Sequence, residues 1–253
     1  MTSLQEFWDT RYEHFNLRES GNLGYSSRYN KWYYRAKKRI LDDALRRHVG
    51  VLEGKHIVDM GAGTGFFIDY FLRRNAGRVL GIDISEKSAN HLARRFASCT
   101  NIDIRRLDIT ADSVSLQEKF HIANVYDLFY LIVDDQSFSR AVRNTCSMVS
   151  DGGTIFIVDM FPPRETMIAE YIKCRPLQAY KEALSKEGVE IQELIPQFFL
   201  MNRDRRSRLL YYLQKALPEL AYYTDALALS MGLHGDGNRS GASFKLMVAK
   251  KSS

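Results

Sequence analysis

A glycine-rich loop is the segment of this sequence best suited to hold a ligand. Asp59 closes a short apolar run and is followed, before a helical pattern begins, by Gly61, Gly63 and Gly65. Glycines at such a place let the backbone turn sharply and approach a ligand at the N-terminus of the helix. A dinucleotide fingerprint would need a further glycine where Phe66 stands, so the spacing disfavours NAD. The loop predicts a nucleotide-type cofactor other than a dinucleotide.

Two further acidic residues close the next two apolar runs. Asp83 ends the run RVLGID, 22 residues after Gly61, which is typical of a carboxylate that accepts both ribose hydroxyls. Asp108 ends the third run, and Leu107 and Ile109 beside it offer flat apolar contacts for an adenine ring. Because the carboxyl ends of parallel strands meet at one edge of a sheet, the three acidic residues indicate a single ligand site.

The elements that must position these residues follow from the apolar pattern. From Lys55 onward, short apolar runs alternate with helical periods, which indicates βαβ units and a parallel sheet. The last two elements are both strands, VEIQELI and SFKLMVAKK. Helices are expected at about 167–186 and 204–231. Without a Pro/Gly/Ser-rich linker, one structural domain is predicted: an N-terminal helical segment at 1–50, then 51–253 with an insertion at about 202–242.

These motifs resemble those of the class I S-adenosylmethionine-dependent methyltransferases. Five segments between about Lys55 and Ser253 each look like a segment of that family. They are the acidic residue with the G-x-G-x-G that follows it, GIDIS, RRLDIT, MVSDGGTIFIVD and the final SFKLMVAKK. The resemblance implies an α/β fold: a Rossmann-like, doubly wound, seven-stranded, mostly parallel sheet with an antiparallel last strand. It also implies S-adenosyl-L-methionine as cofactor and S-adenosyl-L-homocysteine as product.

Carried over position by position, the resemblance assigns cofactor-binding residues. The loop after the first strand would line the methionine and ribose part, and the second and third strand ends would hold the ribose and the adenine. Asp59 would orient the loop or the methionine ammonium. The segment after the fourth strand would pass under the methionine. The assigned residues are Asp59, Gly61, Ala62, Gly63, Gly65, Asp83, Ile84, Asp108, Ile109, Asn124 and Tyr126.

The N-terminal segment is rich in aromatic residues and looks like the lid that often folds over the cofactor in this family. Arg28 and Tyr29 are its candidate cofactor contacts. Between Arg28 and Arg47 the apolar residues recur at helical spacing, which predicts an amphipathic helix whose basic side chains, Lys37 among them, are solvated.

Candidate catalytic residues are few. His234, ahead of the last strand and near Asp236, is on the expected cofactor edge and is the preferred general base. Asp135, after the fourth strand, is a second candidate for orienting an acceptor hydroxyl, although it is equally suited to capping a helix. Many relatives carry a histidine where Leu131 aligns here. The apolar residues of the insertion form a substrate wall, a dimer interface or an ordinary packed helix: Leu209, Tyr212, Leu213, Leu217, Tyr222 and Tyr223.

Composition limits the functional class. The net charge is +6, the three cysteines form no C-x-x-C pair, and neither a signal peptide nor a membrane span is recognisable, so a cytoplasmic location is expected. No metal is expected, because Asp135 and Asp159 alone make a thin site. The leading hypothesis is methyl transfer to a hydroxyl of a small molecule, either a secondary metabolite or a sugar-type substrate. Nucleic acid is not expected as a partner, and a homodimer is one reading of the insertion. The alternatives are an RNA or protein methyltransferase, or a non-catalytic cofactor-binding scaffold.

Overall fold

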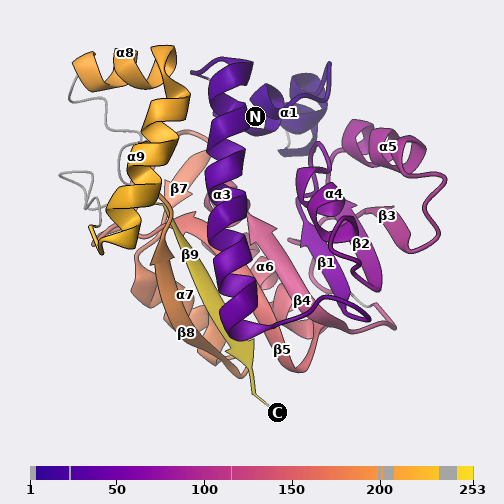
Figure 1. Ribbon diagram of the computed structural model, residues 1–253. Coiled ribbons are helices and arrows are strands. Elements are labelled where there is room, and N and C mark those ends of the chain that lie inside the picture. Colours follow the sequence, from indigo (N-terminus) through magenta and orange to yellow (C-terminus); the bar gives the residue numbers. More distant parts are fainter. Residues whose placement is uncertain are drawn as a thin grey trace.

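The computed structural model contains a seven-stranded sheet in the order β3-β2-β1-β4-β5-β9-β8 (Figure 1). It describes residues 4–22, 24–114, 116–198, 201, 208–233 and 244–252. β9 is antiparallel to both of its neighbours, and the other pairings are parallel. This confirms the predicted sheet. The strands are β1 His56–Met60, β2 Arg78–Asp83, β3 Ile102–Arg106, β4 Phe120–Tyr126, β5 Val149–Met160, β8 Val189–Pro196 and β9 Phe244–Lys251.

Helices cover both faces of the sheet, as is usual for a mostly parallel sheet. Alternate residues of β1 show the division: Ile57 belongs to the core under one set of helices, and Val58 to the core under the other. The Ile57 face is covered by α3 Ser27–His48, α4 Phe66–Leu72 and α5 Glu86–Arg95. The opposite face is covered by α6 Asp135–Met148 and α7 Leu177–Ser185.

Polar side chains cap the N-termini of the helices that follow β2 and β4. The Ser85 side chain accepts from the backbone N–H of Ser88 at the start of α5, and Asp134 accepts from Ser137 at the start of α6. A side chain at the N-cap satisfies a backbone donor that the helix cannot pair, so each helix starts at a defined residue. The strand ends that carry the candidate site are held by these turns.

The predicted single helix at 167–186 is wrong. Residues 166–174 form a hairpin instead, with β6 Thr166–Ala169 paired to β7 Ile172–Cys174, and α7 begins only after Pro176. Proline fixes the extended residue before the helix and donates no hydrogen bond, so the helix cannot extend toward the N-terminus through it. The buried Arg175 follows β7 and bonds to the Ile132 and Val133 carbonyls, tying the hairpin to the segment after β4.

The N-terminal segment consists of α1 Leu4–Arg11, the short α2 Leu17–Ser20 and the long α3. The predicted solvated basic face of α3 needs a correction at Lys37, whose side chain is 0% exposed. It lies among the rings of Tyr33 and Tyr34 and pairs with Asp127. α3 belongs to the main core, whereas α1 and α2 lie over the upper edge of the sheet (Figure 1).

The predicted helical insertion forms two helices, α8 Arg208–Ala216 and α9 Pro218–Ser230. Pro218 separates them, because it occupies the first turn of α9. α9 packs beside α3, where the Trp32 indole donates to Glu219 at 2.7 Å and contacts the Tyr222 ring at 5.1 Å. No helix within the described ranges has the length and apolar character to cross a membrane.

Candidate functional site

The glycine loop joins β1 to α4 and has the backbone shape predicted for it. Gly61, Gly63 and Gly65 have φ values of +70°, +55° and +77°, in the left-handed region that favours glycine. A Cβ on Gly65 would lie 2.6 Å from the Leu92 side chain, and one on Gly63 would lie 3.0 Å from the Tyr12 hydroxyl. The loop therefore depends on glycine for both its conformation and its close packing.

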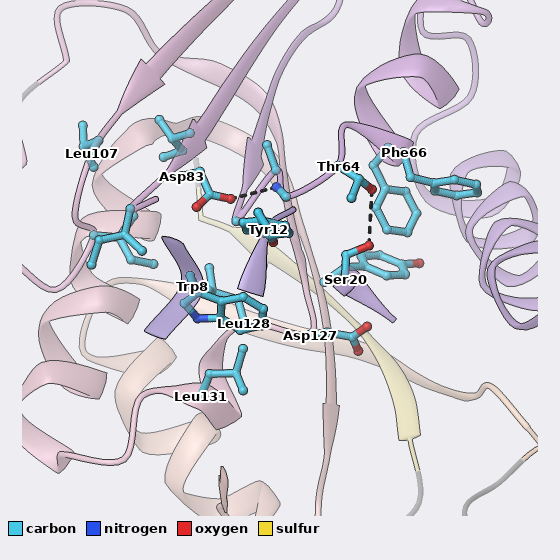
Figure 2. A pocket seen from close by; sticks show the side chains of 18 of the residues that line it. Trp8, Tyr12, Ser20, Thr64, Phe66, Asp83, Leu107, Asp127, Leu128 and Leu131 are labelled. Carbon is cyan, nitrogen blue, oxygen red and sulfur yellow. Dashed lines mark hydrogen bonds between the residues drawn. The ribbon is translucent and has the colours of Figure 1, made fainter. Parts of the chain in front are cut away.

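Asp83 at the end of β2 is bound to the glycine loop. Its Oδ2 accepts from the Gly63 N–H at 2.7 Å (Figure 2). Its Oδ1 accepts from the Ser85 N–H at 2.9 Å. Burial raises the pKa of this carboxyl, and the two backbone hydrogen bonds oppose the shift. Each carboxylate oxygen can accept a second hydrogen bond, so Asp83 could also accept from a ligand in the pocket.

The end of β3 forms the adjoining part of the same pocket. Asp108 accepts from the backbone N–H of Thr110 at 2.8 Å and from its hydroxyl at 2.7 Å. Leu107 and Ile109 line the pocket on either side of it, and Ile84 lines it beside Asp83. These residues form an apolar part of the pocket with a carboxylate beside it.

Asp59 lies behind the loop rather than in the pocket lining. It pairs in register with Asn124 of β4, whose amide donates to Asp59 Oδ1 at 2.7 Å. Burial raises the pKa of Asp59 to about 7. Asp59 Oδ2 and Asn124 Oδ1 are buried with no hydrogen-bond partner. Of the predicted strand-four residues, Tyr126 does line the pocket, packed on Phe67 at 4.2 Å.

Trp8 of α1 and Tyr12, the residue that follows α1, cover the open side of the pocket. Trp8 and Tyr12 both line it and stack on each other at 5.7 Å. Tyr12 stacks in turn on Phe15, which lies against His91 of α5 at 3.9 Å. Burial raises the pKa of Tyr12 well above its usual value.

α2 adds a polar contact to this cover. The Ser20 hydroxyl bonds to that of Thr64 in the glycine loop at 3.2 Å and accepts from the Tyr34 hydroxyl of α3 at 3.0 Å (Figure 2). The pocket has a cavity volume of about 90 Å³.

The segment after β4 supplies residues that the sequence analysis did not assign. Asp127 and Leu128 line the pocket, and Leu131 and Ile132 lie beside them. Asp127 has φ +56° and is paired with Lys37. The one sequence signal for Asp127 was its place directly after the fourth apolar run.

Some predicted residues lie elsewhere. Arg28 is exposed and forms two hydrogen bonds to Glu219 of α9, at 2.8 and 3.0 Å. Tyr29 is fully buried on α3 and donates to the Met201 carbonyl. Neither lines the pocket, because their stretch of α3 packs under α9, so we no longer assign cofactor binding to them.

The two catalytic candidates have different outcomes. Asp135 does not line the pocket, and its carboxylate binds Lys173 at 2.8 Å and Arg175 at 2.8 Å. Hydrogen bonds from Lys173 and then Arg175 lower its pKa. A carboxylate committed to two cations is a poor base, so we no longer assign it catalysis. His234 lies outside the described residues.

The sequence leaves three readings of the insertion open, and the described side chains of 208–233 do not line the pocket as the substrate-wall reading requires. Tyr212, Leu213, Leu217 and Tyr223 are exposed, and Tyr222 packs on Trp32. The side chain of Leu209 lies outside the described part. Among the described residues, no three His, Cys, Asp or Glu side chains are grouped as metal ligands would be.

Comparison with known proteins agrees with this geometry. Residues 57–153 match the family model described as a methyltransferase domain. The ubiquinone biosynthesis O-methyltransferase of Acinetobacter baylyi is 30% identical over 115 residues, 44% of this chain and 46% of that protein. The chain thus spans less than half the length of this relative.

Solved structures share the whole architecture at low identity. Magnesium protoporphyrin IX methyltransferase from Synechocystis PCC 6803, solved with bound S-adenosylmethionine, has a TM-score of 0.60 and 14% identity over 98% of this chain and 95% of that one. The [4+2]-cyclase SpnF has a TM-score of 0.57 and 18% identity over 85% of this chain and 80% of that one. At such identities the likeness establishes the fold alone. Residues 57–153 therefore match a methyltransferase domain, and the chain as a whole has the fold of a solved methyltransferase that binds S-adenosylmethionine.

Proposed function

We propose that this protein transfers a methyl group from S-adenosylmethionine to a hydroxyl of a small-molecule acceptor. The observation that carries the proposal is the pocket along the carboxyl ends of β1 to β4, where the glycine loop, Asp83 and Asp108 follow one another. The family's cofactor carries an adenosyl group, a sulfonium and an amino acid end. Asp108 and Asp83 would meet the adenosyl group, and the glycine loop would meet the sulfonium and the amino acid end.

The residues that would hold the cofactor follow from their contacts. Asp83, fixed by Gly63 and Ser85, suits the ribose hydroxyls. Leu107, Asp108 and Ile109 suit the adenine. The backbone of the glycine loop lies between that end and Asp127, so it suits the sulfonium and methionine part. When bound, the cofactor supplies an electrophilic methyl group on a cationic sulfur.

The enclosed shape of the pocket supports a small acceptor. Trp8 and Tyr12 cover it, and Phe66, Leu128 and Leu131 line it. Such walls exclude water and hold an acceptor in line with the methyl group, which is the main task of the protein in this displacement. Aromatic faces also favour a cationic sulfonium. The O-methyltransferase relatives, named for ubiquinone biosynthesis, support oxygen as the acceptor atom.

The test is transfer of labelled methyl from S-adenosylmethionine into a size-fractionated extract of the source cells. An Asp83→Ala protein is the blank. Label in the small-molecule fraction, recovered as a methyl ether, is the expected result. Label in RNA or protein would refute the small-molecule proposal, and cofactor binding without any transfer would refute enzymatic methylation.

A further inference from the structure

An ion pair lies at the inner end of the pocket and is not explained by cofactor binding as assigned above. Lys37 comes from the middle of α3 and Asp127 from the residue that follows β4. The Lys37 side chain is 0% exposed and that of Asp127 is 16% exposed. The Lys37 ammonium lies 4.4 Å from the Tyr33 ring centre and 5.1 Å from that of Tyr34, so its position is tightly restricted.

The two oxygens of Asp127 have different environments. Oδ2 binds Lys37. Oδ1 is buried with no hydrogen-bond partner, in a residue that lines the pocket. A buried carboxylate oxygen without a donor is costly, and such atoms in native proteins call for an explanation. The residue also has a left-handed backbone at φ +56°, a conformation that clusters at functional sites.

The place of Asp127 along the pocket indicates which ligand group it meets. Asp83 and Leu107 lie toward one end, and Asp127 lies at the other, near Ser20 and Leu128 (Figure 2). Leu128 contacts the glycine loop closely, since a Cβ on Gly61 would lie 3.2 Å from its side chain. Asp127 is therefore beside the part of the loop where the methyl group would be presented.

We infer that Asp127 is a catalytic residue whose Oδ1 accepts a hydrogen bond from the O–H or N–H of the methyl acceptor, and that Lys37 is the positioning residue that holds the carboxylate. The inference rests on the proposed function. It restricts the substrate class to acceptors whose reacting atom carries a proton, which excludes methylation of carbon.

The step balances with the groups named. The acceptor oxygen or nitrogen forms a bond to the methyl carbon while the methyl–sulfur bond breaks and leaves its electron pair on sulfur. The proton of the acceptor passes to Asp127 Oδ1 and from there to water when the cover opens. A positioned base of this kind contributes about 100-fold to 10,000-fold in rate.

The ammonium of the cofactor's amino acid end also donates hydrogen bonds, so it is a second candidate partner for Asp127 Oδ1. The two sources are separated by binding measurements with two probes. S-adenosylhomocysteine carries the amino acid end, and 5′-methylthioadenosine lacks it. An Asp127 that serves the acceptor leaves the affinity for both probes unchanged, because neither probe contains the group that it binds.

The experiment compares Asp127→Asn with Asp112→Asn, the same chemical change at a carboxylate whose side chain is fully exposed. Calorimetry gives the affinities for the two probes, and labelled methyl transfer gives the rate. Asp127→Asn should bind both probes within threefold of the parent protein and transfer methyl at least 100-fold more slowly. Asp112→Asn should match the parent in both.

A third variant separates catalysis from folding. Asp127→Asn removes the carboxylate that pairs with the buried Lys37 ammonium, so this variant is expected to lose stability. The double variant Lys37→Met/Asp127→Asn removes both charges and should recover the melting temperature without recovering transfer. Recovery of transfer in the double variant would show a purely structural pair and overturn the assignment.

The remaining outcomes also decide the matter. Unchanged transfer by Asp127→Asn, or a carbon-methylated product, overturns the assignment. A tenfold loss of affinity for S-adenosylhomocysteine alone would assign Asp127 to the cofactor ammonium and overturn it as well. If the parent protein transfers no label to any fraction, the proposed function itself fails, and this inference fails with it.

Discussion

The Lys37 ammonium contacts the Asp127 carboxylate, and this contact joins the middle of α3 to the end of β4 across 90 positions of sequence. It makes α3 part of the pocket as well as of the core. The N-terminal segment therefore has two roles: α1 and α2 cover the pocket, while α3 supports the residue at its inner end.

Removing one partner of the Lys37–Asp127 ion pair should lower the free energy of unfolding more than removing both partners. Lys37→Met leaves the Asp127 carboxylate largely buried and unpaired, and the expected loss of unfolding free energy is about 3 kcal/mol. The double variant Lys37→Met/Asp127→Asn should recover most of it. Urea denaturation gives both values, with Lys38→Met, at the half-buried neighbour, as the control. A double variant no more stable than Lys37→Met would contradict this account.

Asp83→Ala should weaken S-adenosylmethionine binding by about 10-fold to 100-fold, because hydrogen bonds to a charged group contribute about 1.5–3 kcal/mol. The loop should also lose order, since the Gly63 N–H loses its acceptor. Calorimetric titration measures the change. Asp103→Ala, at a partly exposed carboxylate of β3 outside the pocket lining, is the matched control and should bind normally.

Alanine substitutions at two glycines with positive φ should distinguish backbone strain from steric overlap with a neighbouring side chain. Gly50 has φ +82° and nothing within 4 Å of an added Cβ, so Gly50→Ala should cost only about 1 kcal/mol. Gly65 has φ +77°, and its added Cβ would lie 2.6 Å from Leu92, so Gly65→Ala should cost about 1–3 kcal/mol more. Thermal unfolding compares the two. Equal losses would mean that Leu92 moves aside freely.

The two tryptophans should report differently on ligand binding. Trp8 lines the pocket, whereas Trp32 packs against α9 away from it. S-adenosylhomocysteine should change the fluorescence of a Trp32→Phe protein, in which Trp8 is the remaining indole, and leave that of Trp8→Phe unchanged. Trp8→Ala should also bind the ligand about tenfold more weakly, since a stacked aromatic contact to a cation or base contributes about 1–2 kcal/mol. An unaltered affinity would argue against α1 as a cover.

A buried carboxyl should make stability depend on pH. Burial raises the pKa of Asp159 to about 8, although Tyr180 donates a hydrogen bond to it. In the unfolded chain this group titrates near 4. Between those values the folded state binds the extra proton, so stability falls as pH rises from about 4 to 8 and then levels off.

Asp159→Asn tests this dependence, because the amide does not titrate and its carbonyl still accepts from Tyr180. The variant should lose a slope of at most about 1.4 kcal/mol per pH unit across that window. Denaturation midpoints at several pH values measure the slope. Asp151→Asn, at an exposed carboxylate of β5, should retain the parent slope.

Local sequence was sufficient for the sheet and for the strand ends that line the pocket. Strand ends are marked by an apolar run that stops at an acidic residue, and the left-handed turns at Gly61, Gly63 and Gly65 demand glycine whatever surrounds them. Asp83 and Asp108 therefore lie where the pattern indicated.

Packing between distant segments decided the rest. The helical pattern of α3 placed Lys37 on a basic face, but that face meets the end of β4, where Asp127 gives the ammonium a partner. The apolar pattern at 167–174 suited a helix, but hairpin pairing and the bonds of Lys173 and Arg175 to Asp135 favoured an extended chain. Those same bonds occupied a residue that looked catalytic. Local sequence specifies which backbone shapes are favourable, whereas the partner of a buried charge depends on which surfaces the fold brings together.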